Sequence, residues 1–397
     1  MPFRKKDRPV PALISLAQAR RSVLFAQGVL GKPRFGEGKA GALAAVEHLG
    51  YVQIDTISVV ERAHHHTLWS RVPGYSPAQL QELQTQDRAI FEYWSHAAAY
   101  LPLRDYRFAL RRMEAFANGK RHWFRRDNKV RRYVLDRIRA EGPLRARDFE
   151  APAGHRGGSW FEWKPAKSAL EQLFWCGELM VRERRRFEKV FDLRERVLPD
   201  STDVKMPSKE EFFRHLIGTA LRSQGLATAR EISYQRHIPG AGLLKVLGEM
   251  REAREVLEFK VEGGPGETYY WLNDVCVVTD KGTMGDVRIL SPFDNLVIQR
   301  KRLSRLFSYD YQIECYVPEP KRKFGYFCLP LLRGADFLGR LDAKADRAAG
   351  VLRIENFHWE RSVHKRSSHL AAVQAAIEKF SHFNACTSIL GMEKLTQ

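Results

Sequence analysis

The sequence predicts an α+β protein in which one small unit, three helices followed by a two-stranded ribbon, occurs three times ahead of a region of short strands. Apolar residues at helical spacing recur in groups of three between glycine and proline breaks, and runs that alternate apolar and charged residues follow them. The 397 residues, 44% of them hydrophobic and 11% aromatic, suffice for several compact cores and exclude disorder as the main state.

The first unit is the least regular of the three. Its helix boundaries come from residues that satisfy the free backbone groups at helix ends. In order, the expected segments are a helix capped by Ser15 (15–30), a helix ended by Gly50 (40–50), two extended stretches (51–60 and 64–72) and a helix opened by Ser76-Pro77.

The second unit is the clearest copy. Residues 127–142 predict a helix with Gly142 just past its end, and residues 142–150 predict a short second helix after a Gly-Pro break. A third helix is expected over 163–179, and 180–193 alternates as a hairpin with one solvated face does. Three helices and such a wing make a winged helix, which commonly lays its last helix in a groove of duplex DNA.

The third unit carries two capping boxes, in which a hydroxyl and a carboxyl three residues apart satisfy each other's backbone. The expected segments are a helix opened by Ser208 (208–225), a short helix opened by Thr228, a third helix (240–253) and a ribbon (256–272). After about Val287, short apolar or alternating runs predict a small barrel or sandwich. These runs are 291–300, 308–317, 325–333, 336–347 and 351–359, and a last helix (369–383) closes the chain.

The chain is strongly basic, with 66 Lys and Arg against 47 Asp and Glu and a net charge of +19. A protein of this charge usually binds a polyanion, and nucleic acid is the first candidate. The charge is concentrated in residues 104–148, which hold fifteen Lys and Arg and six Asp and Glu. A solvated helical face would explain this segment too, but the concentration favours a surface that faces phosphates.

Several classes of protein are excluded. The five cysteines lie far apart and form no CxxC pair, so neither a disulfide framework nor a cysteine zinc site is indicated. No signal peptide stands at the N-terminus, and no apolar run approaches the roughly 18 residues of a membrane helix. Walker and dinucleotide fingerprints are missing. On an extended segment the run His64-His65-His66 would point to alternating faces, which favours a polar strand edge over a metal site.

Gln53 and Asp55 form a pair that could handle water. On a strand the two side chains project to one face. The amide could position a water molecule that the carboxylate polarises. The spacing alone is a weak signal, because an aspartate in a turn or at a helix cap is far more common.

The chain resembles the AlkX/AlkZ family of winged-helix DNA glycosylases, and most closely its AlkX branch. The branch signature Gln-apolar-Asp stands here as Gln53-Ile54-Asp55. The matching stretches run almost end to end, over residues 14–34, 51–63, 68–75, 91–102, 142–150, 160–185, 289–332 and 337–347.

The resemblance implies three tandem winged helices followed by a C-terminal β-barrel. The corresponding ranges are 10–115, 116–205, 206–284 and, for the barrel and closing helix, 285–397. It implies hydrolysis of the N-glycosidic bond of N7-alkylguanine and unhooking of interstrand crosslinks, with Asp55 as the catalytic carboxylate and Gln53 as its partner. No cofactor or metal is expected. The expected partner is double-stranded DNA, met by a monomer at the nucleoid of a bacterial cytoplasm.

Phosphate contacts are expected from cations on the second unit and on a turn of the C-terminal region. An aromatic segment that matches the family could line the lesion site, although core packing suits Trp94 better. The candidates are Lys164, Lys167, Arg182, Arg184, Arg186, Lys321, Arg322 and Lys323 for DNA, and Tyr93, Trp94 and His96 for the lesion.

Two other functions fit part of these observations. Winged helices alone would favour a non-enzymatic DNA-binding regulator, since a fold does not fix a function. A regulator normally dimerises to bind two half-sites, and the sequence carries no heptad or other dimer signal. A metal-dependent nuclease is the second rival, and it would differ by cleaving strands only with Mg²⁺.

Overall fold

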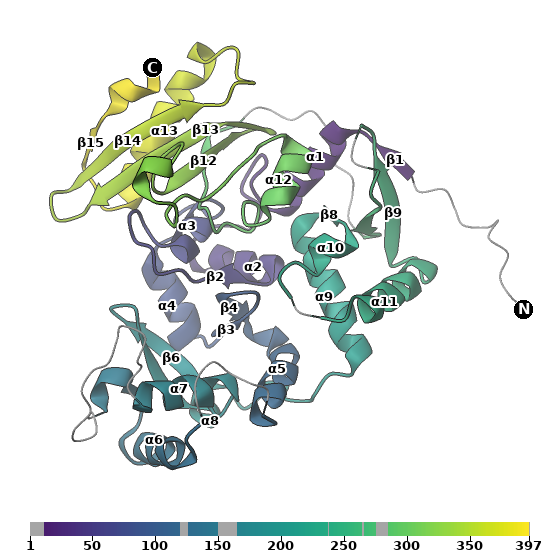
Figure 1. Ribbon diagram of the computed structural model, residues 1–397, viewed down its shortest axis with the longest axis vertical. Coiled ribbons are helices and arrows are strands. Elements are labelled where there is room, and N and C mark those ends of the chain that lie inside the picture. Colours follow the sequence, from purple (N-terminus) through teal and green to yellow (C-terminus); the bar gives the residue numbers. More distant parts are fainter. Residues whose placement is uncertain are drawn as a thin grey trace, which may run out of the picture. The chain divides into compact units, whose positions relative to one another are not determined.

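The computed structural model describes residues 12–119, 126–149, 165–236, 238–263, 266–274 and 285–396 (Figure 1). They form two compact units. The first combines Met1–Ser76 with Phe213–Gln397, and the second, Pro77–Phe212, is inserted into it in sequence. Across the described ranges, no helix is long and apolar enough to cross a membrane.

The N-terminal part of the first unit begins where its capping residues predict. Ser15 Oγ accepts the Gln18 N–H at 3.2 Å, while Gln18 Oε1 accepts the Ser15 N–H at 2.9 Å. Gly50 ends the second helix at φ 75°, and a Cβ there would lie 2.2 Å from Thr219 Cγ2, so only glycine permits this approach. The elements are β1 (Ala12–Ile14), α1 (Leu16–Ala26), α2 (Gly38–Leu49), β2 (Val52–Gln53) and α3 (Ala63–Trp69).

The third predicted repeat has the expected order of elements and both capping boxes. Thr228 Oγ1 accepts the Glu231 N–H at 3.2 Å, and Ser208 Oγ accepts the Glu211 N–H at 3.0 Å. The sheet has the order β1-β9-β10-β8, and β1 adds to it in parallel beside β9, which the sequence did not indicate. The elements are α9 (Lys209–Gln224), β8 (Leu226–Ala227), α10 (Ala229–Ile232), α11 (Gly240–Glu252), β9 (Val256–Val261) and β10 (Tyr269–Leu272).

A curled five-stranded sheet of order β11-β12-β13-β14-β15 forms the C-terminal part, with α13 along one face (Figure 1). Bulges between Leu331 and Leu332 and between Asp342 and Ala343 add to the curvature. The elements are β11 (Arg288–Ile289), α12 (Arg300–Phe307), η3 (Glu319–Lys321), β12 (Cys328–Arg333), β13 (Asp336–Asp346), β14 (Val351–Trp359), α13 (Ser367–Phe383), β15 (Ser388–Leu390) and η4 (Met392–Thr396).

Two expected strands of this region, 291–300 and 308–317, are not strands. In the first, side chains take over the backbone donors that a sheet would need. Ser291 Oγ accepts the Phe293 N–H at 3.2 Å, and Asp294 Oδ1 accepts the Leu296 N–H at 2.9 Å. Such local bonds favour turns over strands, and this one leads directly into α12.

The second compact unit, Pro77–Phe212, contains a sheet with the same strand order as the third predicted repeat. Its sheet β5-β7-β6 pairs the strand after the first helix with the last strand, as β8 pairs with β10. The predicted helix over 142–150 is only a single 3-10 turn. The elements are α4 (Pro77–Thr85), β3 (Ile90–Trp94), β4 (Ala98–Pro102), η1 (Leu103–Asp105), α5 (Arg107–Ala117), α6 (Asn128–Glu141), β5 (Leu144–Arg145), η2 (Ala146–Asp148), α7 (Pro165–Trp175), β6 (Leu179–Arg185), β7 (Glu188–Leu193) and α8 (Arg194–Val197).

The prediction of an extended, polar edge at the three adjacent histidines is wrong, because they lie in α3. His66 is fully buried beside Phe380 of α13, with ring centroids 4.9 Å apart, and its Nε2 lies 2.9 Å from the Ile289 carbonyl. Burial lowers the pKa of His66 to about 4, so the ring is neutral. Packing against α13 outweighs the local pattern here.

Candidate active site

Gln53 and Asp55 lie at the end of a very short strand. Strand β2 stops at Gln53, so the predicted strand over 51–60 is wrong and Asp55 lies two residues beyond its end. Asp55 is half-buried, and its Oδ1 accepts the Ile57 N–H at 2.8 Å in an Asx-type turn. Gln53 and Ile54, the two residues before Asp55, are only 7% and 6% exposed. Their burial anchors the backbone that leads to Asp55.

The environment of the Asp55 carboxylate raises its pKa above the ordinary value. Burial is the main cause, and the N–H groups of Ile57 and Thr56 offset part of it by stabilising the charged form. A carboxylate that is partly desolvated and fixed by backbone donors keeps its position while charge develops nearby. This is the property that electrostatic stabilisation of a cationic transition state requires.

A polar chain from the 291–298 turn supports this segment from behind. Asn295 Nδ2 donates to the Tyr51 carbonyl at 3.0 Å, two residues before Gln53. The turn itself is held by the buried ion pair of Asp294 with Arg71, whose Nη1 lies 2.6 Å from Asp294 Oδ2. Asn295 is only 8% exposed, so its bond to Tyr51 is shielded from water. Asn295 therefore fixes the backbone from which the Gln53–Asp55 pair extends.

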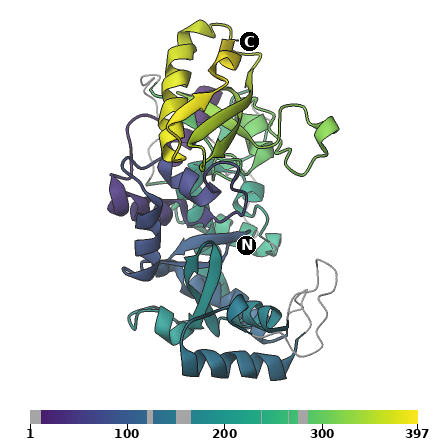
Figure 2. The ribbon, with the colours of Figure 1, turned by 90° about the vertical axis from the view of Figure 1, so that its left-hand side faces the viewer.

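The loop between α12 and β12 passes next to Asp55. Ile57, whose N–H the Asp55 carboxylate holds, packs on the same apolar cluster as Ile313 and Cys315 of this loop. The negative charge of Asp55 also raises the pKa of the Cys315 thiol, after burial as the larger cause. Figure 2 shows the loop, with η3 near its tip, projecting away from the C-terminal sheet.

Two carboxylates fasten the base of this loop. Glu314 accepts the N–H groups of Lys323, Phe324 and Gly325 at 2.8, 2.8 and 3.2 Å, and these bonds lower its pKa although burial opposes the shift. Asp342 of β13 accepts the N–H of Tyr326, two residues before β12 begins, at 2.8 Å. The loop that carries the three adjacent cations is thus closed by a ring of hydrogen bonds.

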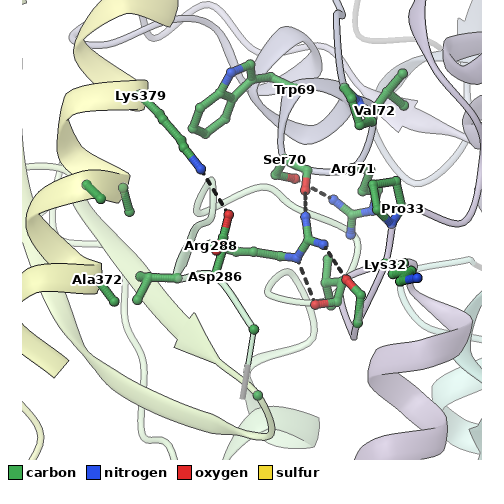
Figure 3. Close-up of a pocket in the computed structure, with 18 residues that line it drawn as sticks. Lys32, Pro33, Trp69, Ser70, Arg71, Val72, Asp286, Arg288, Ala372 and Lys379 are labelled. Atoms are coloured by element: carbon green, nitrogen blue, oxygen red, sulfur yellow. Dashed lines mark hydrogen bonds and ion pairs between the residues drawn. The ribbon is translucent and has the colours of Figure 1, made fainter. Parts of the chain in front are cut away.

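A separate cavity of about 570 Å³ lies in the first unit (Figure 3). It is lined by Trp69, Val72, Ala372 and Ala376 among others, and neither Gln53 nor Asp55 lines it. Arg288 crosses it, but its three guanidinium nitrogens donate to the carbonyls of Val29, Ser70 and Gly31. Arg288 therefore holds three backbone segments together at this cavity.

A family model for AlkZ-like DNA glycosylases matches residues 46–383, a range that includes Gln53 and Asp55. The chain belongs to the AlkZ-like DNA glycosylase family. It is therefore an enzyme, a DNA glycosylase that acts on DNA, and the predicted enzyme class is confirmed. The rival assignment as a non-enzymatic regulator is set aside by the same match.

A solved structure supports the fold of this glycosylase. The Streptomyces sahachiroi DNA glycosylase AlkZ superposes with a TM-score of 0.60 at 16% sequence identity, covering 95% of this chain and 98% of that one. At this identity the similarity shows a shared fold. The predicted mixed α+β architecture and the resemblance to this family are confirmed.

Among the DNA-contact candidates of the second unit, the structure gives Arg184 a structural partner. Its guanidinium binds both carboxylate oxygens of Glu92, at 2.7 and 2.8 Å, and also donates to the Phe187 carbonyl at 2.7 Å. Arg182 is half-exposed beside Asp192, at 3.3 Å, and Arg186 is exposed at the β6–β7 turn. Lys167 is exposed on α7, whereas Lys164 lies outside the described residues.

On the α12–β12 loop, Lys321 and Lys323 are exposed and Arg322 is half-buried. The Arg322 Nε donates to the Val317 carbonyl at 2.9 Å, and its guanidinium lies 4.9 Å from the centre of the Tyr326 ring. The two lysines therefore present their charge to solvent from a braced loop.

The arginines that the structure describes in the basic segment 104–148 are largely paired within the compact unit Pro77–Phe212. They bind acidic side chains or carbonyl groups, and this pairing could not be predicted from counting charges. The pairs are Arg107–Glu211, Arg111–Pro207, Arg131–Glu178, Arg137–Glu141, Arg139–Asp136, Arg145–Asp148 and Arg147–Glu188.

The aromatic segment predicted to line the lesion site belongs to the core of the second unit. Tyr93 is 1% exposed, and its hydroxyl donates to the Trp175 carbonyl at 2.8 Å. Trp94 packs 4.9 Å from the ring of Trp175 on α7, so it joins a core with the second predicted repeat rather than the core of the first one, while His96 is half-buried. A lesion-contacting role for these three residues stays a prediction.

Sequence reasoning missed Asn295 and Tyr316, the neighbours of the candidate pair that the structure adds. Asn295 could have been suspected only from its place in a Pro-Phe-Asp-Asn turn, which by itself predicts no contact with Tyr51. Tyr316 follows Cys315 in a stretch expected to be a strand, and nothing in the sequence indicated its exposure.

Proposed function

We propose that this glycosylase hydrolyses the N-glycosidic bond of N7-alkylguanine and unhooks interstrand crosslinks, leaving an abasic site. The observation that carries the proposal is the pair Gln53 and Asp55, a buried amide and a half-buried carboxylate within one backbone-anchored segment. An N7-alkylguanine is already cationic, so it leaves without protonation by an acid. The enzyme need only stabilise the oxocarbenium-like sugar and direct water to C1′.

Each residue has a separate role in this reaction. The Asp55 carboxylate stabilises the positive charge that develops on the sugar and polarises the attacking water. The Gln53 amide positions that water without carrying charge. No Schiff base is needed, so the reaction ends at the abasic site without strand cleavage and requires neither metal nor cofactor.

The substrate range follows from the exposure of the loop beside Asp55. A crosslinked base is tied to both strands and cannot rotate fully into a deep pocket, unlike the usual substrates of base-flipping enzymes. The loop beside Asp55 is open to solvent at Lys321 and Lys323. An open surface of this kind suits bulky or linked lesions.

We further propose that the three repeated helical units, residues 10–115, 116–205 and 206–284, are winged helices that follow the duplex. The curled sheet and α13, within residues 285–397, then form a small barrel-like domain. Support comes from the shared strand order of β5-β7-β6 and β8-β10-β9. Phosphates are met by Lys164, Lys167, Arg182 and Arg186 of the second unit and by Lys321, Arg322 and Lys323. The enzyme acts as a monomer on DNA of the bacterial nucleoid, in the cytoplasm.

Incubation with a nitrogen-mustard-crosslinked duplex, followed by alkaline cleavage and a denaturing gel, tests the function. We expect abasic sites at the linked guanines and separated strands, with full activity in excess EDTA. The substrate class would be refuted if this duplex stays crosslinked and a second duplex, carrying N7-methylguanine, keeps its methylated base. Strand cleavage that requires Mg²⁺ would instead support a nuclease.

A further inference from the structure

Tyr316 is the most exposed of the large apolar side chains in the described part of the chain, at 76%. Single exposed aromatic residues are common and carry no meaning alone. Tyr316 differs because of its surroundings: it lies on the loop that carries three adjacent cations, and it is close enough to the candidate catalytic carboxylate of Asp55 to be affected by its charge.

Packing and electrostatics together place it near Asp55. Cys315, the preceding residue, packs on the apolar cluster that also holds Ile57, and the Asp55 carboxylate binds the Ile57 N–H at 2.8 Å. The electrostatics agree, since burial and then the charges of Cys315 and Asp55 raise the pKa of the Tyr316 hydroxyl. The ring thus stands in solvent at the edge of the site.

The backbone under this ring is fixed. Val317, the next residue, donates its N–H to the Glu314 carbonyl at 2.9 Å and accepts the Arg322 Nε at 2.9 Å. The Glu314 side chain meanwhile closes the loop through three backbone donors. A rigid backbone that holds an aromatic face in water loses little entropy when that face is covered.

We propose that Tyr316 stacks on a nucleobase beside the sugar that Asp55 serves, so that it fills the gap left when the alkylated guanine is partly unstacked. This proposal rests on the proposed function for the identity of the lesion. The ligand is the π-face of a base, which every nucleotide offers, so the contact is insensitive to sequence. The lysines at 321 and 323 lie on the same loop and can hold the adjacent phosphates while the ring contacts the base.

Stacking is tested with variants that separate the ring from its size and from its hydroxyl. Tyr316→Phe keeps the ring and should bind a duplex with an abasic-site analogue as the wild type does. Tyr316→Leu keeps an apolar side chain without a ring, and should raise the half-saturating enzyme concentration roughly 5- to 150-fold, the range found for base–aromatic stacking. Phe25→Leu, at another exposed aromatic residue, is the matched control and should change nothing.

Fluorescence gives a readout that a merely structural role would not move. A 2-aminopurine placed next to the abasic-site analogue should be quenched by the wild type and by Tyr316→Phe, and should stay bright with Tyr316→Leu. Equal quenching by all variants, or equal binding by Tyr316→Leu, overturns the proposal. This assay needs no catalysis. If the wild type fails to release N7-methylguanine while the quenching pattern holds, the proposed function fails and the stacking contact stands.

Discussion

Arg71 and Asp294 form an ion pair through two hydrogen bonds, and both side chains are fully buried, although the two residues lie 223 positions apart in sequence. The second bond joins Arg71 Nη2 and Asp294 Oδ1 at 2.8 Å, and Arg71 Nε donates to the Gln27 carbonyl at 2.8 Å. The pair thus joins the ends of α1 and α3 to the turn whose Asn295 holds Tyr51. The geometry of the candidate site depends on a contact far along the chain.

Removing one member of this pair should strongly destabilise the first unit. Arg71→Met leaves the Asp294 carboxylate buried without its cation, and breaking such a pair typically costs about 3–5 kcal/mol. Thermal and urea unfolding measure the loss. Lys379→Met is the matched control, because the Lys379–Asp286 pair is exposed (66% and 83%) and should contribute at most about 1 kcal/mol. Equal effects of the two substitutions would contradict the assigned burial.

Asn295→Ala should slow base release more than it lowers stability, because it frees the Tyr51 carbonyl behind Gln53. A lost hydrogen bond of this kind costs about 1 kcal/mol in stability. Single-turnover rates should fall further than that value predicts, while duplex affinity stays unchanged. Asn295→Asp cannot donate to the carbonyl either and should behave like the alanine variant. Wild-type rates in both variants would show that Asn295 does not position the site.

Three neutral histidines, one of them buried (His66) and two half-buried (His48 and His65), predict loss of stability at mildly acidic pH. Burial lowers the pKa of His48, His65 and His66 to about 4 each, from about 6.5 in the unfolded chain. The unfolded state therefore binds more protons than the folded state between these values. Stability is fully present above pH 6.5 and falls as the pH drops toward 4, by about 1.4 kcal/mol per pH unit for each histidine.

Urea unfolding at pH 7, 6 and 5 checks this slope. The control variant His364→Gln replaces an exposed histidine and should leave the slope unchanged. Constant stability down to pH 5 would contradict the neutral state of the three rings.

Binding of undamaged duplex should be nearly sequence-blind and depend steeply on salt. With about five to eight phosphates neutralised, the slope of log K against log salt should lie at about −4 to −7. Lys321→Ala combined with Lys323→Ala should reduce the slope by about 2, since each phosphate contributes about 0.9. Lys365→Ala with Lys379→Ala is the control pair and should leave the slope unchanged. A strong preference for one undamaged sequence would count against the assignment.

Much of the fold could be predicted because its signals are local. Capping by Ser15 and Thr228 and the glycine at position 50 depend on residues a few positions apart, and the structure has them where expected. The pairing of β1 with β9 joins segments about 250 residues apart and leaves no local signal. For the same reason the sequence predicts an edge at His66, because its burial depends on residues far along the chain, such as Ile289 and Phe380.

The candidate site was predictable only through the family signature. Local chemistry places Asp55 in an ordinary Asx turn, and its bond to Ile57 is of that common type. Charge counting was a weaker guide, because it cannot show pairing. Arg184, expected on phosphate, binds Glu92, which is 1% exposed and lies about ninety residues earlier. Lys321 and Lys323 sit in a shorter segment with less total charge, but they are exposed.

The decisive prediction concerns Asp55→Asn. The change is nearly isosteric, and an amide oxygen can still accept the Ile57 N–H, so the turn and its packing should survive. It removes the charge that stabilises the oxocarbenium-like sugar, and losing one such group typically lowers the rate by ~10²–10³. DNA affinity should stay the same or rise slightly, because a carboxylate no longer faces the phosphates. Gln53→Ala should slow the reaction less.

Because burial raises the Asp55 pKa, wild-type activity should fall on acidification at a higher pH than an ordinary aspartate would give. Single-turnover release of N7-methylguanine at several pH values measures both effects, and wild-type rates in Asp55→Asn would show that this carboxylate is not catalytic.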